Sequence, residues 1–356
     1  MKKILLTFIL ALFYLTSNGQ KCIKNGKIED LKQLQERELV VVIYKENQKY
    51  VEKLEKKIAK NNKKKAKFEK ELKDYKNHIS LFNNSIKEVV SSYWKLNNTE
   101  NVKYLTKKEV KALSKSKSNK FAILDLTFDV VMADFETLQT MEIYVITYGP
   151  SEKKRNDAFF QNHITNVNYN LPGYADKKQK KQIEKLKEER ESSAKILSKE
   201  NLIVSILLSQ KYIEKAIDLN EKISFEDLAI EEAKANCSEL ENSTILIQEA
   251  SVHGKIQEDL KTLLPKANIK LVSANRITQA LENKEDVLIG FLTVKKFMKA
   301  KSKLGPISAS SVLPISHKVI LNAKTKKIIN FIKHSGVTSY PYFRKKDIKK
   351  LNSECE

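Results

Sequence analysis

The chain contains few of the residue types from which most catalytic and ligand-binding motifs are built. Its 356 residues include 8 glycines, 3 cysteines and 5 arginines. The glycines form neither Gly-x-Gly-x-x-Gly nor Gly-x-x-x-x-Gly-Lys, the patterns whose backbone holds phosphate groups. Three widely spaced cysteines are not a disulfide framework. Either Cys22 and Cys355 form one disulfide bridge, or these two and Cys237 all remain thiols. The sequence therefore predicts neither a phosphate loop nor a disulfide-rich domain.

Catalytic and metal-binding patterns are also absent from the sequence. The five histidines stand apart, without metal-ligand spacing, and we expect them on the surface or in loops: His78, His163, His253, His317 and His334. There is no Gly-x-Ser-x-Gly motif, and the serine-rich stretch 305–311 is predicted to be a flexible loop. Asp125 and Asp129 share one strand face about 13 Å apart, too far for paired acid–base catalysis, and should be solvated. We predict no catalytic residues, no metal site and no cofactor.

The net charge of +22 favours anionic partners, but its composition limits which ones. Nearly all the excess is lysine, whereas planar, bidentate recognition of bases and phosphates favours arginine. The lysines are also spread along the whole chain. Specific nucleic-acid binding is therefore not predicted. Affinity for an anionic lipid or glycan surface is predicted as an alternative function.

The amino terminus has the pattern of a secretory signal peptide. Two lysines precede an apolar run from Ile4 to Leu15, and Ser17 and Gly19 suit the −3 and −1 positions of a cleavage site. Removal of residues 1–19 would leave no transmembrane segment, because later apolar runs are far below the roughly 20 residues that a spanning helix needs. We expect an exported protein, periplasmic or secreted.

The first predicted α/β domain covers residues 20–150 and is interrupted by a helical insertion at about 46–96. Within the insertion, apolar residues alternate at spacings of four and three, which indicates a helix with one apolar stripe. The sequence allows one long helix or a hairpin that turns at Asn61. Such a stripe needs a partner, so we predict a partner-binding surface at Phe68, Leu72, Tyr75, Ile79, Phe82 and Ile86. An envelope protein or a second copy of the chain is the expected partner.

Residues 151–240 are predicted to be a linker followed by a helical connector, and residues 241–356 a second α/β domain with a basic tail. In this second domain, strands are expected at 244–247, 269–273 and 287–293, with helices at 255–264 and 274–281, followed by a hairpin of 318–321 and 328–332. The same order occurs between Val40 and Thr127, where Thr106 and Glu109 form a capping-box pattern. The fold class is therefore α/β (α+β), with two βαβαβ-plus-hairpin halves. They are either a duplication or share only the order common to βαβ units.

This order of elements behind a signal peptide resembles the accessory α/β domains of bacterial envelope proteins. It is similar to the amino-terminal domain of the Tol-system propeller protein and to the curli-secretion lipoprotein family, through the strand and capped helix at 102–113 and 269–281. The resemblance implies a protein-interaction module in the cell envelope. It transfers no site residue, and the chain lacks a propeller, a pore hairpin and a lipobox. The expected function is a non-enzymatic envelope scaffold, with an anionic-surface binder or a hydrolase as alternatives.

Overall fold

The computed structural model describes residues 31–97, 100–113, 120–131, 136–148, 154–167, 199–221, 223–252, 268–304, 307–332 and 342–353. The predicted signal peptide, the predicted helix 255–264 and residues 168–198 of the predicted linker and connector lie outside these residues. Cys22 and Cys355 lie outside them as well, and Cys237 is a half-buried free thiol.

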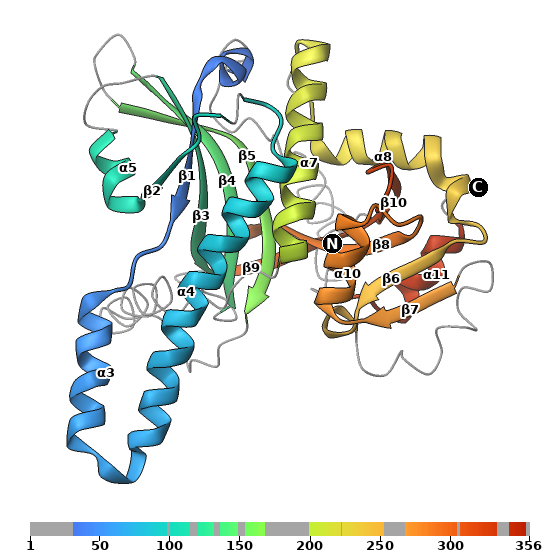
Figure 1. The fold of residues 1–356 in the computed structure, drawn as a ribbon. Helices are drawn as coiled ribbons and strands as arrows, with labels where there is room; N and C mark the ends of the chain where they lie inside the picture. Colours follow the sequence, from blue (N-terminus) through green and yellow to red (C-terminus); the bar gives the residue numbers. More distant parts are fainter. Residues whose placement is uncertain are drawn as a thin grey trace.

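A mixed ten-stranded sheet runs through the molecule, and helices pack against it (Figure 1). Its strands pair in the order β10-β9-β8-β5-β4-β3-β1-β2, and β6 and β7 join it through β8. The strands are β1 (Glu38–Ile43), β2 (Lys103–Thr106), β3 (Phe121–Val131), β4 (Glu136–Tyr148), β5 (Lys154–Val167), β6 (Thr244–Gln248), β7 (Asn268–Val272), β8 (Leu288–Leu304), β9 (Ile307–Asn322) and β10 (Ile328–Ile332). The predicted mixed α/β class is confirmed.

Seven α-helices and four short 3-10 helices complete the described structure. The α-helices are α3 (Gln48–Lys60), α4 (Lys65–Tyr93), α5 (Lys107–Leu113), α7 (Lys199–Leu219), α8 (Phe225–Asn236), α10 (Ala274–Glu282) and α11 (Lys345–Ser353). The 3-10 helices are η1 (Gln33–Glu36), η2 (Asn62–Lys64), η3 (Cys237–Leu240) and η4 (Glu249–Ser251).

The first half of the sheet is built around β1. Its residues 39–42 are buried and apolar, as expected for a strand covered on both faces. Leu39 and Val41 belong to the core beneath α4, whereas Val40 and Val42 pack with Val110 of α5. Strand β1 pairs in parallel with β2 and β3, and β4 and β5 continue the sheet in antiparallel pairing. One core therefore lies on each side of the same strand.

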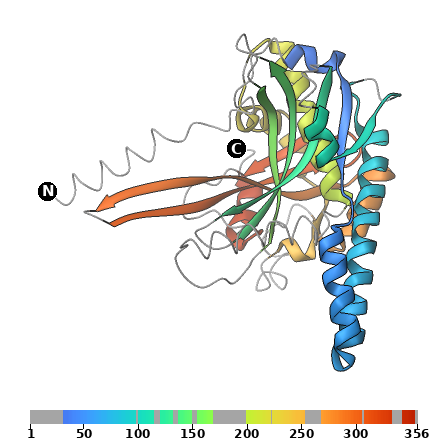
Figure 2. The same cartoon turned by 90° about the vertical axis from the view of Figure 1, so that its left-hand side faces the viewer.

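The second half is built in the same way around β6. This strand pairs in parallel with β7 and β8, and β9 and β10 follow in antiparallel pairing. Strands β8 and β9 extend well beyond the rest of the molecule as a long hairpin (Figure 2). A pairing of His163 on β5 with Val294 on β8 joins the two halves into one sheet.

Helix α7 lies between the two halves and contacts both. Its apolar run 202–208 is helical, although an apolar run of this length also suits a buried strand. The ammonium group of Lys199 pairs with Glu88 of α4 and, at 2.6 Å, with Glu282 of α10. Burial acts to lower the pKa of Lys199, but hydrogen bonds to Glu282 and Glu88 outweigh it and the pKa is raised. The connector is thus held to both halves by charge as well as by packing.

Caps at the helix starts agree with the sequence. The backbone N–H of Thr106 donates to Glu109 Oε2 at 2.7 Å, and the N–H of Glu109 donates to Thr106 Oγ1 at 3.4 Å, so the predicted capping box is confirmed. The hydrogen bonds from Thr106 hold the pKa of Glu109 below its ordinary value. In the second half, Ser273 accepts a hydrogen bond from the N–H of Arg276 and begins α10.

Helix α11 covers the outer face of the second half. Phe343, Ile348 and Leu351 pack there against apolar residues of β6, β9 and β10. The ammonium group of Lys318 on β9 lies 3.7 Å from the carboxylate of Asp347, and both side chains are fully buried. The predicted basic tail is therefore partly a packed helix.

Two segments differ from the sequence expectations. The predicted linker from residue 151 contains β5, which pairs with β4 from Lys154 to Val167. The predicted serine-rich loop at 305–311 is largely β9, paired with β8 from Ile307 onward. Both are polar segments, and strand pairing uses backbone groups that every residue except proline supplies in full.

Candidate interaction surface on the helical hairpin

Helices α3 and α4 form a hairpin whose tip extends away from the sheet (Figure 1). Asn47 caps α3 by accepting a hydrogen bond from the N–H of Tyr50 at 3.2 Å, and Asn61 accepts one from the N–H of Lys64 in the turn. The rings of Tyr50 and Tyr75 meet edge to face, 4.9 Å apart. The hydroxyl of Tyr75 also accepts a hydrogen bond from the N–H of Asn47. These contacts hold α3 against α4.

The predicted partner-binding stripe on α4 is used mostly within the chain. Tyr75, Ile79, Phe82 and Ile86 are at most 8% exposed and belong to the main core. Leu72 is half-buried against the same core, and Phe68 is half-buried beneath the ammonium group of Lys57, 5.0 Å from its ring centre. The heptad pattern therefore reports packing against this protein's own elements, and the proposed stripe is not an open docking surface.

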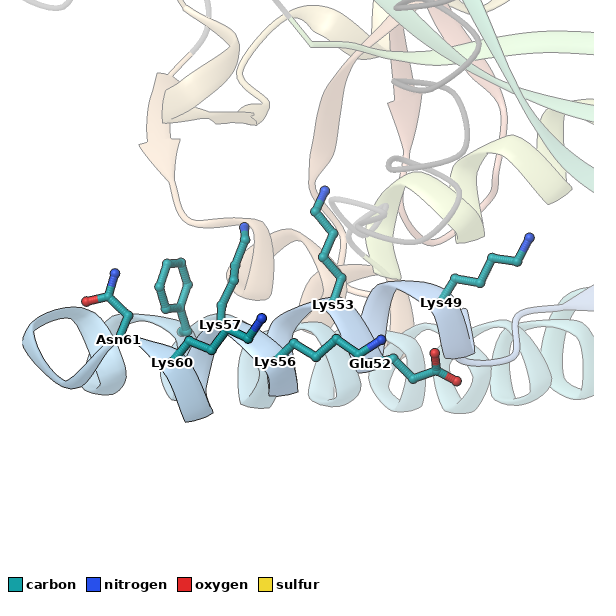
Figure 3. A pocket seen from close by; sticks show the side chains of 8 residues that line it. Lys49, Glu52, Lys53, Lys56, Lys57, Lys60 and Asn61 are labelled. Atoms are coloured by element: carbon teal, nitrogen blue, oxygen red, sulfur yellow. The ribbon is translucent and has the colours of Figure 1, made fainter.

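The exposed face of α3 is basic instead. Five lysines line a shallow hollow of about 640 Å³ together with Glu52, Asn61 and Phe68: Lys49, Lys53, Lys56, Lys57 and Lys60. These five lysines occupy positions i, i+4, i+7, i+8 and i+11 of the helix. At about 100° of rotation per residue, they fall within an arc of about 100° around the helix and extend over about 17 Å along its axis. Figure 3 shows three of them, Lys49, Lys53 and Lys57, projecting in the same direction from the helix. We call these five lysines the basic face.

The segment that carries the basic face has a strong positive charge. Residues 49–70 contain ten lysines and three glutamates, a net charge of +7. Within the described part of the chain, Lys49, Lys56 and Lys60 form no ion pair, whereas Lys103, Lys199 and Lys211 each pair with a glutamate on another element. A row of ammonium groups attracts a multiply charged acidic surface without requiring bidentate geometry.

Sequence reasoning missed the basic face although its signal is present. The spacing of the lysines is visible in the sequence, but the apolar stripe of the following helix, α4, suggested a partner-binding surface more directly. The apolar stripe of α4 correctly predicted a helix, but its residues pack against the protein's own core and not against a partner.

Two titratable side chains that the sequence placed in solvent are buried instead. His317 is 1% exposed, its ring lies against Phe331, and its Nε2 is 3.4 Å from Oε1 of the buried Glu226. Asp125 is also buried, at 7% exposure. The expectations of a surface histidine and a solvated aspartate were wrong at these positions. Among the described residues, no cluster of three His, Cys, Asp or Glu side chains has the geometry to hold a metal ion.

Comparison with protein-family models, with curated proteins and with solved structures found no match to this chain. The resemblance to envelope domains therefore stays a prediction. In the segments that the structure describes, every helix is too short or too polar to cross a membrane.

Proposed function

We propose that the protein is an exported, non-enzymatic scaffold of the cell envelope that docks on acidic partner surfaces through the basic face of α3. The observation that carries this proposal is the projecting hairpin, whose apolar stripe is packed internally while its outer lysines stay exposed. Export is supported by the signal-peptide pattern of residues 1–19.

The exposed lysines favour protein docking by charge over insertion into a bilayer. Large apolar side chains that are exposed in the described residues are Leu81 and Leu219, and neither lies at the hairpin tip. A surface that inserts into lipid usually presents apolar or aromatic side chains beside its basic ones. Salt-dependent adhesion to anionic lipid or glycan remains the second candidate, because the lysines alone attract either surface.

A capture experiment tests the proposed function. The mature chain and the variant K49E/K56E/K60E are each immobilised and exposed to detergent-solubilised envelope, and bound proteins are identified by mass spectrometry. We expect acidic envelope proteins to be enriched by the natural chain and lost with the variant. Equal enrichment by both would contradict docking through the basic face. Capture of anionic vesicles without protein enrichment would favour the surface-binding alternative.

We also propose that the two halves arose by duplication. The support is that a single alignment of the two halves matches the register of the central strand, β1 or β6, with both of its parallel neighbours. Val40 lies opposite Lys103 on one side and Ile123 on the other, and Leu246 lies opposite Lys270 and Ile289. The same alignment brings Thr106 onto Ser273, the residues that precede α5 and α10. An experimental structure in which either register is shifted by one residue would contradict this proposal, since such a shift reverses the faces of a strand.

A further inference from the structure

An acidic surface lies where α7 ends and α8 begins, although the chain as a whole is strongly basic. Residues 214–231 contain six carboxylates and two lysines. The exposed carboxylates are Glu214, Asp218, Glu221, Asp227 and Glu231, which we call the acidic end. In the described segments, none of these five forms an ion pair.

The acidic end contains repulsive contacts that an outside cation would relieve. Glu214 and Asp218 are one helical turn apart on α7, and Asp227 and Glu231 have the same spacing on α8. Like charges at this spacing destabilise a helix. Burial and the charge of Asp218 raise the pKa of Glu214. Beside them, Leu219 is 45% exposed, one of two large apolar side chains exposed in the described residues.

The basic face and the acidic end match in spacing and lie at opposite ends of the molecule. Lys49, Lys53 and Lys57 repeat every four residues, a rise of about 6 Å, and the carboxylate pairs repeat at the same interval. The hairpin tip lies at the bottom of Figure 1, and the end of α7 that leads into α8 lies at the top; Figure 2 agrees. A single copy cannot bring these two surfaces together.

We propose that the basic face of one copy docks on the acidic end of a second copy, so that the scaffold assembles head to tail. This inference rests on the proposed function, since both use the basic face as the contact, and it names the partner of that face. Because each copy has one surface of each kind, the head-to-tail contact joins two different surfaces, and its repetition extends to chains or rings.

Charge decides the conditions under which the contact forms. The net charge of +22 repels whole molecules at low salt, where the Debye length is about 30 Å at 0.01 M. At about 0.1 M salt the Debye length is about 10 Å, so facing groups still attract while distant charges are screened. Association should therefore be strongest near this concentration and weaken at 0.5 M.

Charge reversal of the two surfaces tests the proposal. Sedimentation velocity is run on the mature chain, on K49E/K56E/K60E and on E214K/D218K/E231K, at 0.1 and 0.5 M salt. We expect the natural chain to associate with rising concentration, and each variant alone to associate at least about tenfold more weakly. An equimolar mixture of the two variants should associate again, because each unlike pair then meets with opposite charges while like pairs repel.

A matched control separates this contact from a general effect of charge. The variant K108E/K270E/K349E makes the same charge change at exposed lysines of α5, β7 and α11, away from both surfaces, and should associate like the natural chain. Lysine and glutamate have similar helix propensities, and thermal unfolding of each variant checks that it is folded. The proposal is overturned by a natural chain that stays monomeric at both salt concentrations. It is equally overturned if either reversed variant associates like the natural chain, or if the mixture associates no better than its components. A monomeric chain that still captures envelope proteins through the basic face would leave the proposed function standing.

Discussion

Replacing Asp347 with asparagine should destabilise the second half strongly, because the change removes the charge that faces a buried ammonium group. Lys318 and Asp347 are both fully buried, with Nζ and Oδ2 3.7 Å apart. Asp347 also accepts a hydrogen bond from the N–H of Arg344 at 2.9 Å, at the start of α11. Asparagine keeps the shape of the side chain and one carbonyl oxygen, so the main loss is electrostatic.

The expected loss is about 3 kcal/mol of the free energy of unfolding at pH 7. Removing one partner of a buried ion pair costs about 3–5 kcal/mol. The lower end of this range applies, because burial lowers the pKa of Lys318 from 10.5 to about 8. Without Asp347, whose charge raises this pKa, the pKa of Lys318 falls further, so the ammonium group can release its proton near neutral pH rather than remain charged and unpaired.

Urea unfolding followed by circular dichroism measures this loss, with D286N as the control. Asp286 pairs with Lys324 at 4.0 Å on the surface, where the two side chains are 77% and 58% exposed, so D286N should cost less than about 1 kcal/mol. The double variant K318M/D347N should recover part of the stability, since the buried ammonium group is gone, whereas the guanidinium group of Arg344, 3.4 Å from Asp347 and 17% exposed, still loses its partner. A loss for D347N no larger than that for D286N would refute the reasoning.

Three further outcomes follow from single contacts. The folded-state pKa of Lys318, about 8, lies below its ordinary value of 10.5, so the unfolded chain binds more protons between these values. Stability should therefore rise by about 3 kcal/mol as the pH rises across this range. Urea midpoints at pH 7.5 and 10 should show this rise in the natural chain and a smaller one in K318M, and equal rises would contradict it. The pKa of Glu109 is lowered by its hydrogen bonds to Thr106, so the carboxylate stabilises the fold at neutral pH. This contribution is lost as the pH falls through the folded-state pKa. The stability difference between the natural chain and E109Q should be present at pH 7 and vanish in acid, and a constant difference would contradict the prediction. A Cβ at Gly290 would lie 2.8 Å from Cγ1 of Ile247, so G290A should cost about 1–3 kcal/mol of stability. In thermal unfolding, the double variant G290A/I247A should lose less stability than the sum of the two single losses, because I247A removes the atoms that clash. Strict additivity would rule out this clash.

Local pattern predicted the elements well where their side chains have a regular period. The apolar run of β1, the capping box at Thr106 and the stripe of α4 each indicated the element that forms. Strand β5 was missed because its polar sequence resembles a linker, and its place in the sheet depends on backbone pairing with β4. His317 was assigned to the surface because a lone histidine carries no signal of burial, which depends on Phe331 and Glu226 from distant elements.

The sequence by itself determined the α/β class, the strands β1 to β4 and β6 to β8 with the helices α5 and α10, and the helical character of the insertion, because these follow from the spacing of side chains along a few turns or residues. The tertiary structure alone decided what each surface faces. It packed the stripe around Phe82 against the protein's own core, and it left four of the five lysines of the basic face exposed at one end. It also left carboxylates of α7 and α8 exposed where the first of these helices ends and the second begins. Burial and ion pairing depend on which distant segments meet, and side-chain spacing within one segment carries no information about its neighbours in space.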